Sequence, residues 1–364
     1  MTIRRTVGIF IAAIVAAFAF AGTEFVSIAG DDREAEAAHN PRTTTIRYGP
    51  YSMPAGDGTH EGGGSTDNLI DLFAAKPCAD CYILGISPNA VWSENDPMHP
   101  GQQMNFSTHG MLHHFVLANL NRDDPTCERF NFGGLIGLLG ERIFASGNER
   151  TIMTLPSGYG YYVGLFDTWS LVIDLMNHAM MPRDGYIELT YTWVPRHWFS
   201  RNPTSVRPVW LDIDNCADSE VDLPFNYSDT HSDWTSTFGG TIIGAGGHLH
   251  EHGISISVEN ATRGGYPCVS VAGYPPPPAQ TPRGPGAGTP GHPANYNTVT
   301  TDPFGIENYR DDTGTAWLSD MTLCTAPVSY SRGDVLRVHA QYHNGSAHAH
   351  HGQMGIMILF IRPN

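Results

Sequence analysis

Glycine, proline, asparagine and aspartate divide this sequence into short apolar runs, and this punctuation limits the possible folds more than any other feature. The chain has 40 glycines and 26 prolines in 364 residues and lacks long helix-forming stretches. Strand-length runs between turn residues are typical of β-sandwiches and barrels, so we predict an all-β protein. The clearest expected strands are 81–86, 112–120, 161–166, 186–194, 241–244, 254–258, 335–342 and 355–361.

The N-terminal segment predicts export. Two arginines, Arg4 and Arg5, precede an apolar run at 7–21 that is too short for a confident transmembrane helix. We expect 1–38 to be a signal peptide and disordered lead-in, with a general secretion signal favoured over a twin-arginine address and an uncleaved anchor as the alternative. The mature protein is then secreted or extracytoplasmic, in the cell envelope, with no stable membrane insertion.

Prolines predict where the chain divides. Pro195, Pro203 and Pro208 interrupt the strand pattern between two tryptophans, as a linker requires. We therefore expect an N-terminal β-sandwich at 39–203 and a C-terminal β-sandwich at 204–364. Two low-complexity or glycine-rich segments, 133–141 and 274–293, are expected to be loops.

Cysteine content and charge narrow the class of protein. Six cysteines in an exported chain predict disulfides, with Cys268 and Cys324 as the first expected pair. Cys78 and Cys81 form a CxxC, which we expect to bond to other cysteines because no second CxxC completes a zinc site. The formal charge of −16 argues against a nucleic-acid partner and suits a cationic ligand or a metal.

Eighteen histidines, many of them clustered, carry the strongest chemical signal. His248 and His250 are two residues apart, so on a strand both imidazoles project from one face and can reach one ion. His113 and His114 are adjacent, and two adjacent ligands need a strand end, a bulge or a metal at the sheet edge. A third histidine-rich stretch, 343–351, leads to Met354 at the start of the last expected strand.

Met354 beside imidazoles points to copper. A thioether suits Cu(I) better than zinc, magnesium or calcium, while imidazole also accepts Cu(II). A blue-copper site fits less well, because no cysteine lies near the cluster. Each feature also has a structural interpretation: packed histidine pairs, a methionine that fills the core, and solvated loop histidines at His39, His60, His99, His197, His231 and His292.

Other catalytic patterns are absent from the sequence. It contains no G-x-S-x-G elbow, H-E-x-x-H or P-loop. A bicupin also has H-x-H, but the glutamate expected a few residues later is missing, since Glu251 follows His250 directly.

The order of these motifs resembles the copper type II, ascorbate-dependent monooxygenase superfamily, which includes the peptidylglycine alpha-hydroxylating monooxygenases. The stretches 112–116, 244–250 and 350–357 are most similar to the stress-upregulated nodulin-like proteins of that superfamily. The resemblance covers roughly residues 75–361 and rests on short motifs in a specific order.

The resemblance implies two tandem jelly-roll β-sandwich domains, each with one copper. The ligands would be His113, His114 and His178 in the first domain, and His248, His250 and Met354 in the second. In the family the second copper binds oxygen and abstracts hydrogen, so His248, His250 and Met354 would be catalytic, while the first copper supplies an electron. Ascorbate or another reductant would be the co-substrate, and a small organic molecule would be hydroxylated with O2.

Some positions depart from the family. Where peptide-hydroxylating members anchor a carboxylate, this chain has Gly246, Ile356 and Ile358, which argues against a peptide substrate. Further histidines at His109, His252, His350 and His351 have no assigned role. The alternative function is therefore a non-catalytic extracytoplasmic copper-binding or stress protein.

Overall fold

Antiparallel strands make up nearly all of the regular structure in the computed structural model, which describes residues 40–58, 63–127, 140–198, 201–216, 219–224, 226–274, 318, 320–344 and 350–364. In this part of the chain the single helical segment is the 3-10 turn η1 (Phe106–Thr108). The all-β prediction is confirmed, and each of the eight expected strands overlaps an observed one. The signal segment, most of 133–141 and nearly all of 274–293 lie outside the described residues.

The first sandwich consists of two sheets built from residues 42–205. One sheet has the order β1-β10-β4-β8-β11, with β7 on β4; its strands are β1 (Arg42–Met53), β10 (Arg183–Pro195), β4 (Cys81–Trp92), β8 (Tyr159–Val163), β11 (Thr204–Ser205) and β7 (Met153–Thr154). The other has the order β2-β9-β5-β6, with β3 on β9; its strands are β2 (Gly64–Ser65), β9 (Trp169–Asn177), β5 (Gly110–Asn119), β6 (Glu141–Gly147) and β3 (Leu69–Ala74).

Strands after residue 206 form the second sandwich. One sheet has the order β12-β23-β15-β19, with β20 on β15; its strands are β12 (Arg207–Asp212), β23 (Gly355–Pro363), β15 (Gly240–Leu249), β19 (Leu323–Cys324) and β20 (Val328–Tyr330). The other has the order β14-β21-β16-β17-β18, with strands β14 (Asn226–Thr235), β21 (Val335–Asn344), β16 (Gly253–Asn260), β17 (Cys268–Gly273) and β18 (Asp320–Met321). A small pair consists of β13 (Val221–Leu223) and β22 (His350–Gln353).

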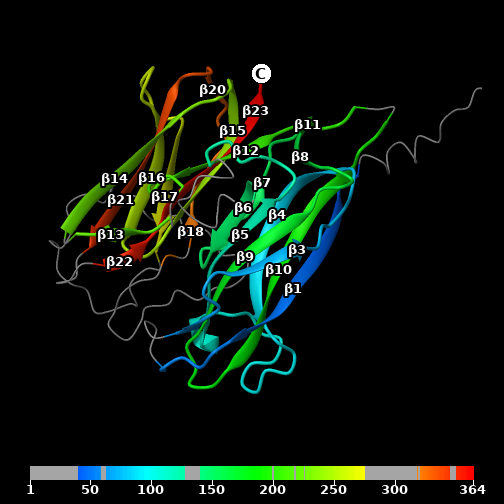
Figure 1. The fold of residues 1–364 in the computed structure, drawn as a ribbon, viewed down its shortest axis with the longest axis vertical. Helices are drawn as coiled ribbons and strands as arrows, with labels where there is room; N and C mark the ends of the chain where they lie inside the picture. Colours follow the sequence, from blue (N-terminus) through cyan, green and yellow to red (C-terminus); the bar gives the residue numbers. More distant parts are fainter. Residues whose placement is uncertain are drawn as a thin grey trace, which may run out of the picture. The chain divides into compact units, whose positions relative to one another are not determined.

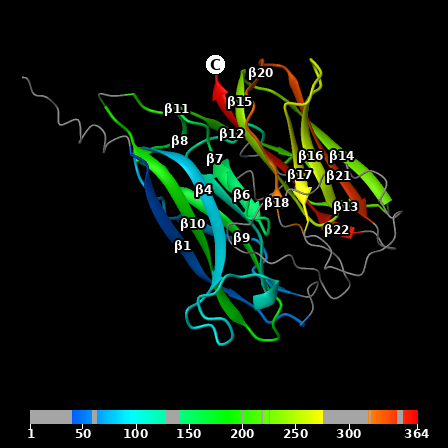
Figure 2. The same cartoon turned by 180° about the vertical axis from the view of Figure 1, so that it is seen from behind.

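The sheet of β12, β23 and β15 is shared between the two sandwiches, and both views show it near the strands of each (Figures 1 and 2). On β23, Ile356 and Ile358 join the core of the first sandwich, whereas the alternate residues Met357 and Leu359 join the second core. A strand with two buried faces has apolar residues at every position rather than at alternate ones. This explains the unbroken apolar run at 355–361 and confirms that the last strand is buried.

The change of sheet at residue 206 lies close to the expected boundary at 203/204. Residues 41–364 nevertheless form one compact unit, because the shared sheet supplies both cores. The division into two domains stays a prediction, as does the jelly-roll connectivity. Pro208 lies in β12, at the edge of its sheet, where a missing N–H leaves no ladder partner unsatisfied.

Three disulfides join the cysteines in the pairs Cys78–Cys81, Cys127–Cys216 and Cys268–Cys324. The predicted pairing of Cys268 with Cys324 is confirmed. The expectation that Cys78 and Cys81 bond to other cysteines is wrong, because the other four are already paired and these two lie with Cα atoms 6.2 Å apart.

The environment indicated by these bonds is oxidising, as outside the cytoplasm. No segment in the described part of the chain forms a helix of the length and apolarity needed to span a bilayer.

The Cys127–Cys216 disulfide is expected to stabilise the fold more than the Cys78–Cys81 disulfide does. It closes a sequence separation of 89 residues, against 3 for the CxxC pair. The chain-entropy model gives about 4–5 kcal/mol for the long loop and about 2 kcal/mol for the short one. Denaturant unfolding of C127A/C216A and C78A/C81A tests this, and equal losses of unfolding free energy in the two double variants would contradict it.

Candidate metal centre

A β-bulge on β5 brings two neighbouring histidines together. The pairing of β5 with β9 shifts by one residue, so that Leu112 lies opposite Leu175 whereas His114 lies opposite Asp174. The extra residue is His113, and a bulge of this kind redirects a side chain that a regular strand would send to the other face. The ring centroids of His113 and His114 lie 4.8 Å apart. Adjacent histidines needed a strand end, a bulge or a sheet edge to bind one ion together, and the structure supplies the bulge.

The end of β15 supplies two more imidazoles. His248 is the second-last residue of the strand, and His250 directly follows the strand. Their ring planes are perpendicular, with centroids 5.3 Å apart. On the neighbouring strand His248 lies opposite Ile356, which belongs to the core of the first sandwich. Both histidines are buried, and they approach the bulge of β5 from the second sandwich.

Histidines from the two sandwiches converge at this point. The ring centroid of His250 lies 4.8 Å from that of His113 and 6.2 Å from that of His114. One ligand atom from each of these three residues lies within 4.8 Å of the others. Metal–imidazole bonds are about 2 Å long, so two nitrogens on one ion lie at most about 4 Å apart and only small side-chain movements are needed.

This grouping differs from the expected one, which divided the histidines between two ions. The structure does not bring His178 to His113 and His114. His178 follows β9, and its backbone N–H donates to the carbonyl of His109, just beyond the Gly110–Asn177 end of the β5–β9 ladder, whereas His114 lies opposite Asp174. Its ring packs against Phe106, with centroids 5.6 Å apart.

Met354 is the cross-strand neighbour of His250. The backbone N–H of His250 donates to the Met354 carbonyl oxygen over 3.3 Å, and the Met354 side chain is buried in the core of the first sandwich. Met354 therefore shares a sheet face with Ile356, the residue opposite His248. Of the other sequence candidates, His109 is exposed, His252 lies in a turn with φ 68°, and the side chains of His350 and His351 lie outside the described residues.

Carboxylates orient two of the clustered imidazoles. His113 Nδ1 lies 2.7 Å from Asp174 Oδ2, and His248 Nδ1 lies 2.9 Å from Glu149 Oε1. A carboxylate accepts, so each Nδ1 carries the proton and each Nε2 is left with its lone pair. Burial raises the pKa of Glu149, but the contact with His248 holds it below its ordinary value overall. The pKa of Asp174 is also lowered, since the bond with His113 outweighs burial.

Neutral oxygen acceptors orient the other two rings. His250 Nδ1 donates to the carbonyl oxygen of Gly352 over 2.8 Å, and His114 Nε2 lies 2.9 Å from Asn68 Oδ1. These contacts leave the lone pair on Nε2 of His250 and on Nδ1 of His114. Partners of this kind fix the tautomer and the orientation of metal-binding histidines.

The nitrogens turned toward the cluster are buried. Within the described residues, Nδ1 of His114 and Nε2 of His248 and His250 have no hydrogen-bond partner. A buried polar atom left unpaired costs about 1–3 kcal/mol, so such atoms are rare unless a ligand satisfies them. Converging, neutral, buried imidazole nitrogens are a donor set that fits copper or zinc.

Burial also keeps most of the ligands free of protons. It lowers the pKa of His114 to about 3 and that of His250 well below its ordinary value, and the nearby charge of His113 adds to both effects. Burial likewise disfavours the charged form of His113, but the hydrogen bond to Asp174 outweighs it and the pKa of His113 is raised. A metal therefore competes with a proton mainly at His113.

Close packing at a glycine brings the two sandwiches together here. A Cβ at Gly147, the last residue of β6, would lie 2.5 Å from the carbonyl oxygen of His113 and 2.8 Å from Cε1 of His248. Any larger residue would push His248 away from His113. The backbone N–H of Gly147 also donates to Glu149 Oε1 over 2.9 Å, which holds the carboxylate that orients His248.

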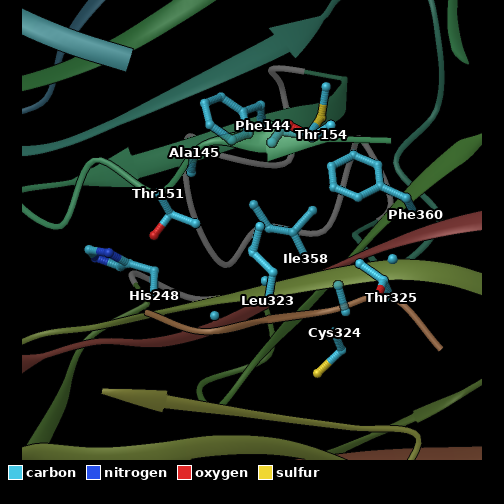
Figure 3. Close-up of a pocket in the computed structure, with 15 residues that line it drawn as sticks. Phe144, Ala145, Thr151, Thr154, His248, Leu323, Cys324, Thr325, Ile358 and Phe360 are labelled. Atoms are coloured by element: carbon cyan, nitrogen blue, oxygen red, sulfur yellow. The ribbon is translucent and has the colours of Figure 1, made fainter. Parts of the chain in front are cut away.

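An apolar cavity of about 40 Å³ adjoins the cluster. Figure 3 shows His248 at one end of it and Phe360 at the other, with Ile358 and Leu323 between them. Gly246 also lines the cavity. Gly246 and Ile358, two of the three positions at which the resemblance would place a carboxylate anchor, therefore form apolar walls.

The groups that orient the imidazoles were not predicted from the sequence. Asp174 could have been recognised, because it is the one charged residue in the apolar strand Trp169–Asn177. A charged side chain in a buried strand is almost always paired with another group. Glu149 and Asn68 lie in a turn and a bend, and Gly352 contributes only a backbone carbonyl from the short strand β22, so no local pattern marks them.

Known proteins give partial matches. No family model matches the chain. It is 28% identical over 212 residues to the probable copper-dependent oxygenase M1 of a Phoma species, covering 53% of this chain and 47% of that protein. It is 33% identical over 119 residues to the probable copper-dependent oxygenase clz3 of Cochliobolus lunatus, covering 30% of this chain and 34% of that protein. The chain thus matches less than half the length of each relative.

The similarity to solved structures is weak. The major capsid protein P2 of bacteriophage PM2 aligns over 89% of this chain and 98% of its own, at 8% identity and a TM-score of 0.30, and this similarity supports no conclusion about fold or function.

Replacing Asp174 should weaken metal binding, whereas replacing His178 should not. Asp174→Asn removes the charge that orients His113, and losing such a partner typically lowers metal affinity about 10- to 100-fold. His178→Gln is the matched control, because His178 directly follows β9 and lies outside the cluster. Competition for Cu(I) with a colorimetric chelator at pH 8 measures both. An equal loss in His178→Gln would contradict the cluster and restore the expected ligand set.

Proposed function

We propose that this protein is an exported copper-dependent oxygenase of the monooxygenase type, using O2 and a reductant such as ascorbate. The observation that carries the proposal is the convergence of His113 with the buried His114 and His250, whose unpaired ring nitrogens face the cluster. The partial matches to two proteins named as probable copper-dependent oxygenases support the same chemistry. The disulfides support a location outside the cytoplasm.

The proposed site holds one copper ion on these three imidazoles. Bound copper supplies one-electron redox chemistry and a place for O2 to bind. Asp174 holds the His113 ring in the ligand tautomer, and the Gly352 carbonyl does the same for His250. Burial keeps His114 and His250 unprotonated, so that neither has to lose a proton before it binds the ion.

His248 and Met354 are proposed to act beside this set. The Nε2 atom of His248 is buried and unpaired within the described residues, and its ring lies edge-on to His250. Glu149 fixes its orientation, so His248 offers a fourth nitrogen next to the three. Met354, opposite His250, offers the thioether that favours Cu(I).

The cavity beside His248 suggests the substrate class. Its walls are mainly apolar, and its volume of about 40 Å³ holds a few heavy atoms rather than a whole large molecule. We propose that an apolar carbon segment of a small organic substrate lies there, with the C–H bond to be hydroxylated near His248. The described residues that line the cavity include no arginine or lysine, so they do not suit a peptide carboxylate.

A non-catalytic copper-binding protein is the second candidate. The observation that favours it is the small space at the cluster itself, about 20 Å³, lined by His113, His248 and His250 among others. This space can hold a metal ion, but it leaves little room for a substrate beside the ion.

Oxygen consumption separates the two candidates. The copper-loaded protein should consume O2 with ascorbate faster than the same amount of free copper, and His250→Gln should return the rate to that background because the ion loses a ligand. Met354→Ala should also lower the rate, whereas His178→Gln should keep it. If the wild-type protein binds copper tightly but never exceeds the background with any reductant, the protein holds copper without catalysis.

A further inference from the structure

A second group of potential metal ligands lies on the exposed outer face of the second sandwich. His231 on β14 lies directly opposite His339 on β21, and their ring centroids are 5.4 Å apart. Asp229, two residues before His231, projects from the same face. One ligand atom from each of the three lies within 4.8 Å of the others. We expected His231 to lie in a loop, but it lies within the edge strand of this sheet.

His339 is held between two carboxylates. Its Nδ1 lies 3.1 Å from Asp229 Oδ1, and its Nε2 lies 3.1 Å from Glu259 Oε2 on β16. A neutral imidazole has only one N–H, so it can donate to one of these carboxylates only. The lone pair on the other nitrogen would then face a negatively charged oxygen. That contact is favourable only with a positive charge between the two atoms, either a second proton or a metal ion.

The surrounding side chains fix the carboxylate without neutralising it. Gln341 Nε2 donates to Asp229 Oδ2 over 3.3 Å, and Ser255 Oγ in turn donates to the Gln341 side chain. Arg337, two residues before His339 on β21, forms a two-bond ion pair with Asp233 at 2.6 and 2.8 Å. Its charge is therefore already matched by another carboxylate.

We propose that Asp229, His231 and His339 form a second metal site, for Zn(II) or a similar divalent cation. Two imidazoles and one carboxylate are a common ligand set for zinc, with the remaining position taken by water. Glu259 would accept a hydrogen bond from the Nε2–H of His339, which leaves the lone pair of Nδ1 to bind the ion. Asp229 would change from a hydrogen-bond acceptor to a ligand.

The position of this site gives it a role in the fold. β14 is an edge strand of ten residues, and none of them is buried. Trp234 packs against the second core, but residues 228–232 are all polar, so apolar packing contributes little to keeping this part of β14 on β21. An ion bridging Asp229 and His231 of β14 to His339 of β21 clamps the edge strand to its neighbour. The site is separate from the buried cluster and does not depend on the proposed oxygenase activity.

Titration with Zn(II) by calorimetry tests the proposal on the intact protein. The wild-type protein should bind one more equivalent of Zn(II) than His231→Gln or Asp229→Asn. His343→Gln is the matched control, because His343 is an exposed histidine on the same strand, β21, at the same alternation as His339. It should bind as many equivalents as the wild type. If His231→Gln binds Zn(II) with the stoichiometry and affinity of His343→Gln, the site does not exist.

Hydrogen exchange provides a second readout that the buried cluster does not influence. Zn(II) should slow the exchange of the β14–β21 amides in the wild type and leave them unchanged in His231→Gln. Glu259→Gln should keep the stoichiometry but lower the affinity about 10- to 100-fold, as expected for loss of an orienting carboxylate. If Zn(II) leaves wild-type exchange in β14 unchanged, a proton alone satisfies His339 and the clamp is overturned. Copper content at the buried cluster should be the same in all these variants.

Discussion

The end of β15 lies against the bulge of β5, and the rest of the candidate centre depends on this contact. It places His250 from one sandwich beside His113 and His114 from the other. Each unpaired buried nitrogen costs about 1–3 kcal/mol, so the metal-free protein carries a penalty that an ion at the cluster removes. Binding and folding are therefore coupled at this site.

The shared sheet makes that contact rigid. Because β23 has one core on each face, its register with β15 cannot slip by one residue without turning Ile356 and Met357 into the wrong cores. The same register determines the face from which His248 projects. Gly147 then allows the backbone of β6 to approach the His248 ring closely. Packing over the whole sheet thus determines the direction of the imidazoles before any ion is present.

Local patterns in the sequence predicted the strands better than they predicted which strands and side chains contact one another. The apolar run at 355–361 predicted a buried strand, and the two-residue spacing of His248 and His250 predicted ligands on one face of one strand. The edge strand β14 has no buried residue, so it gave no apolar signal, and His231 was expected in a loop.

The grouping of the ligands could not be read from the chain. Which histidines meet depends on which sheet faces pack together, and no spacing within one segment encodes that contact. The resemblance to a two-copper family assigned His178 to His113, but the β5–β9 register places His178 next to His109. Asp174, four residues earlier and within β9, is the residue that reaches His113.

Counting the copper retained after a chelator wash tests the central claim most directly. With one ion held jointly by His114 and His250, the wild type should retain one tightly bound copper per chain, and His114→Gln and His250→Gln should each retain none. Two coppers in a His231→Gln background, which lacks the proposed surface site, with one remaining when His114→Gln or His250→Gln is added, would show that these histidines serve separate ions and would contradict the account.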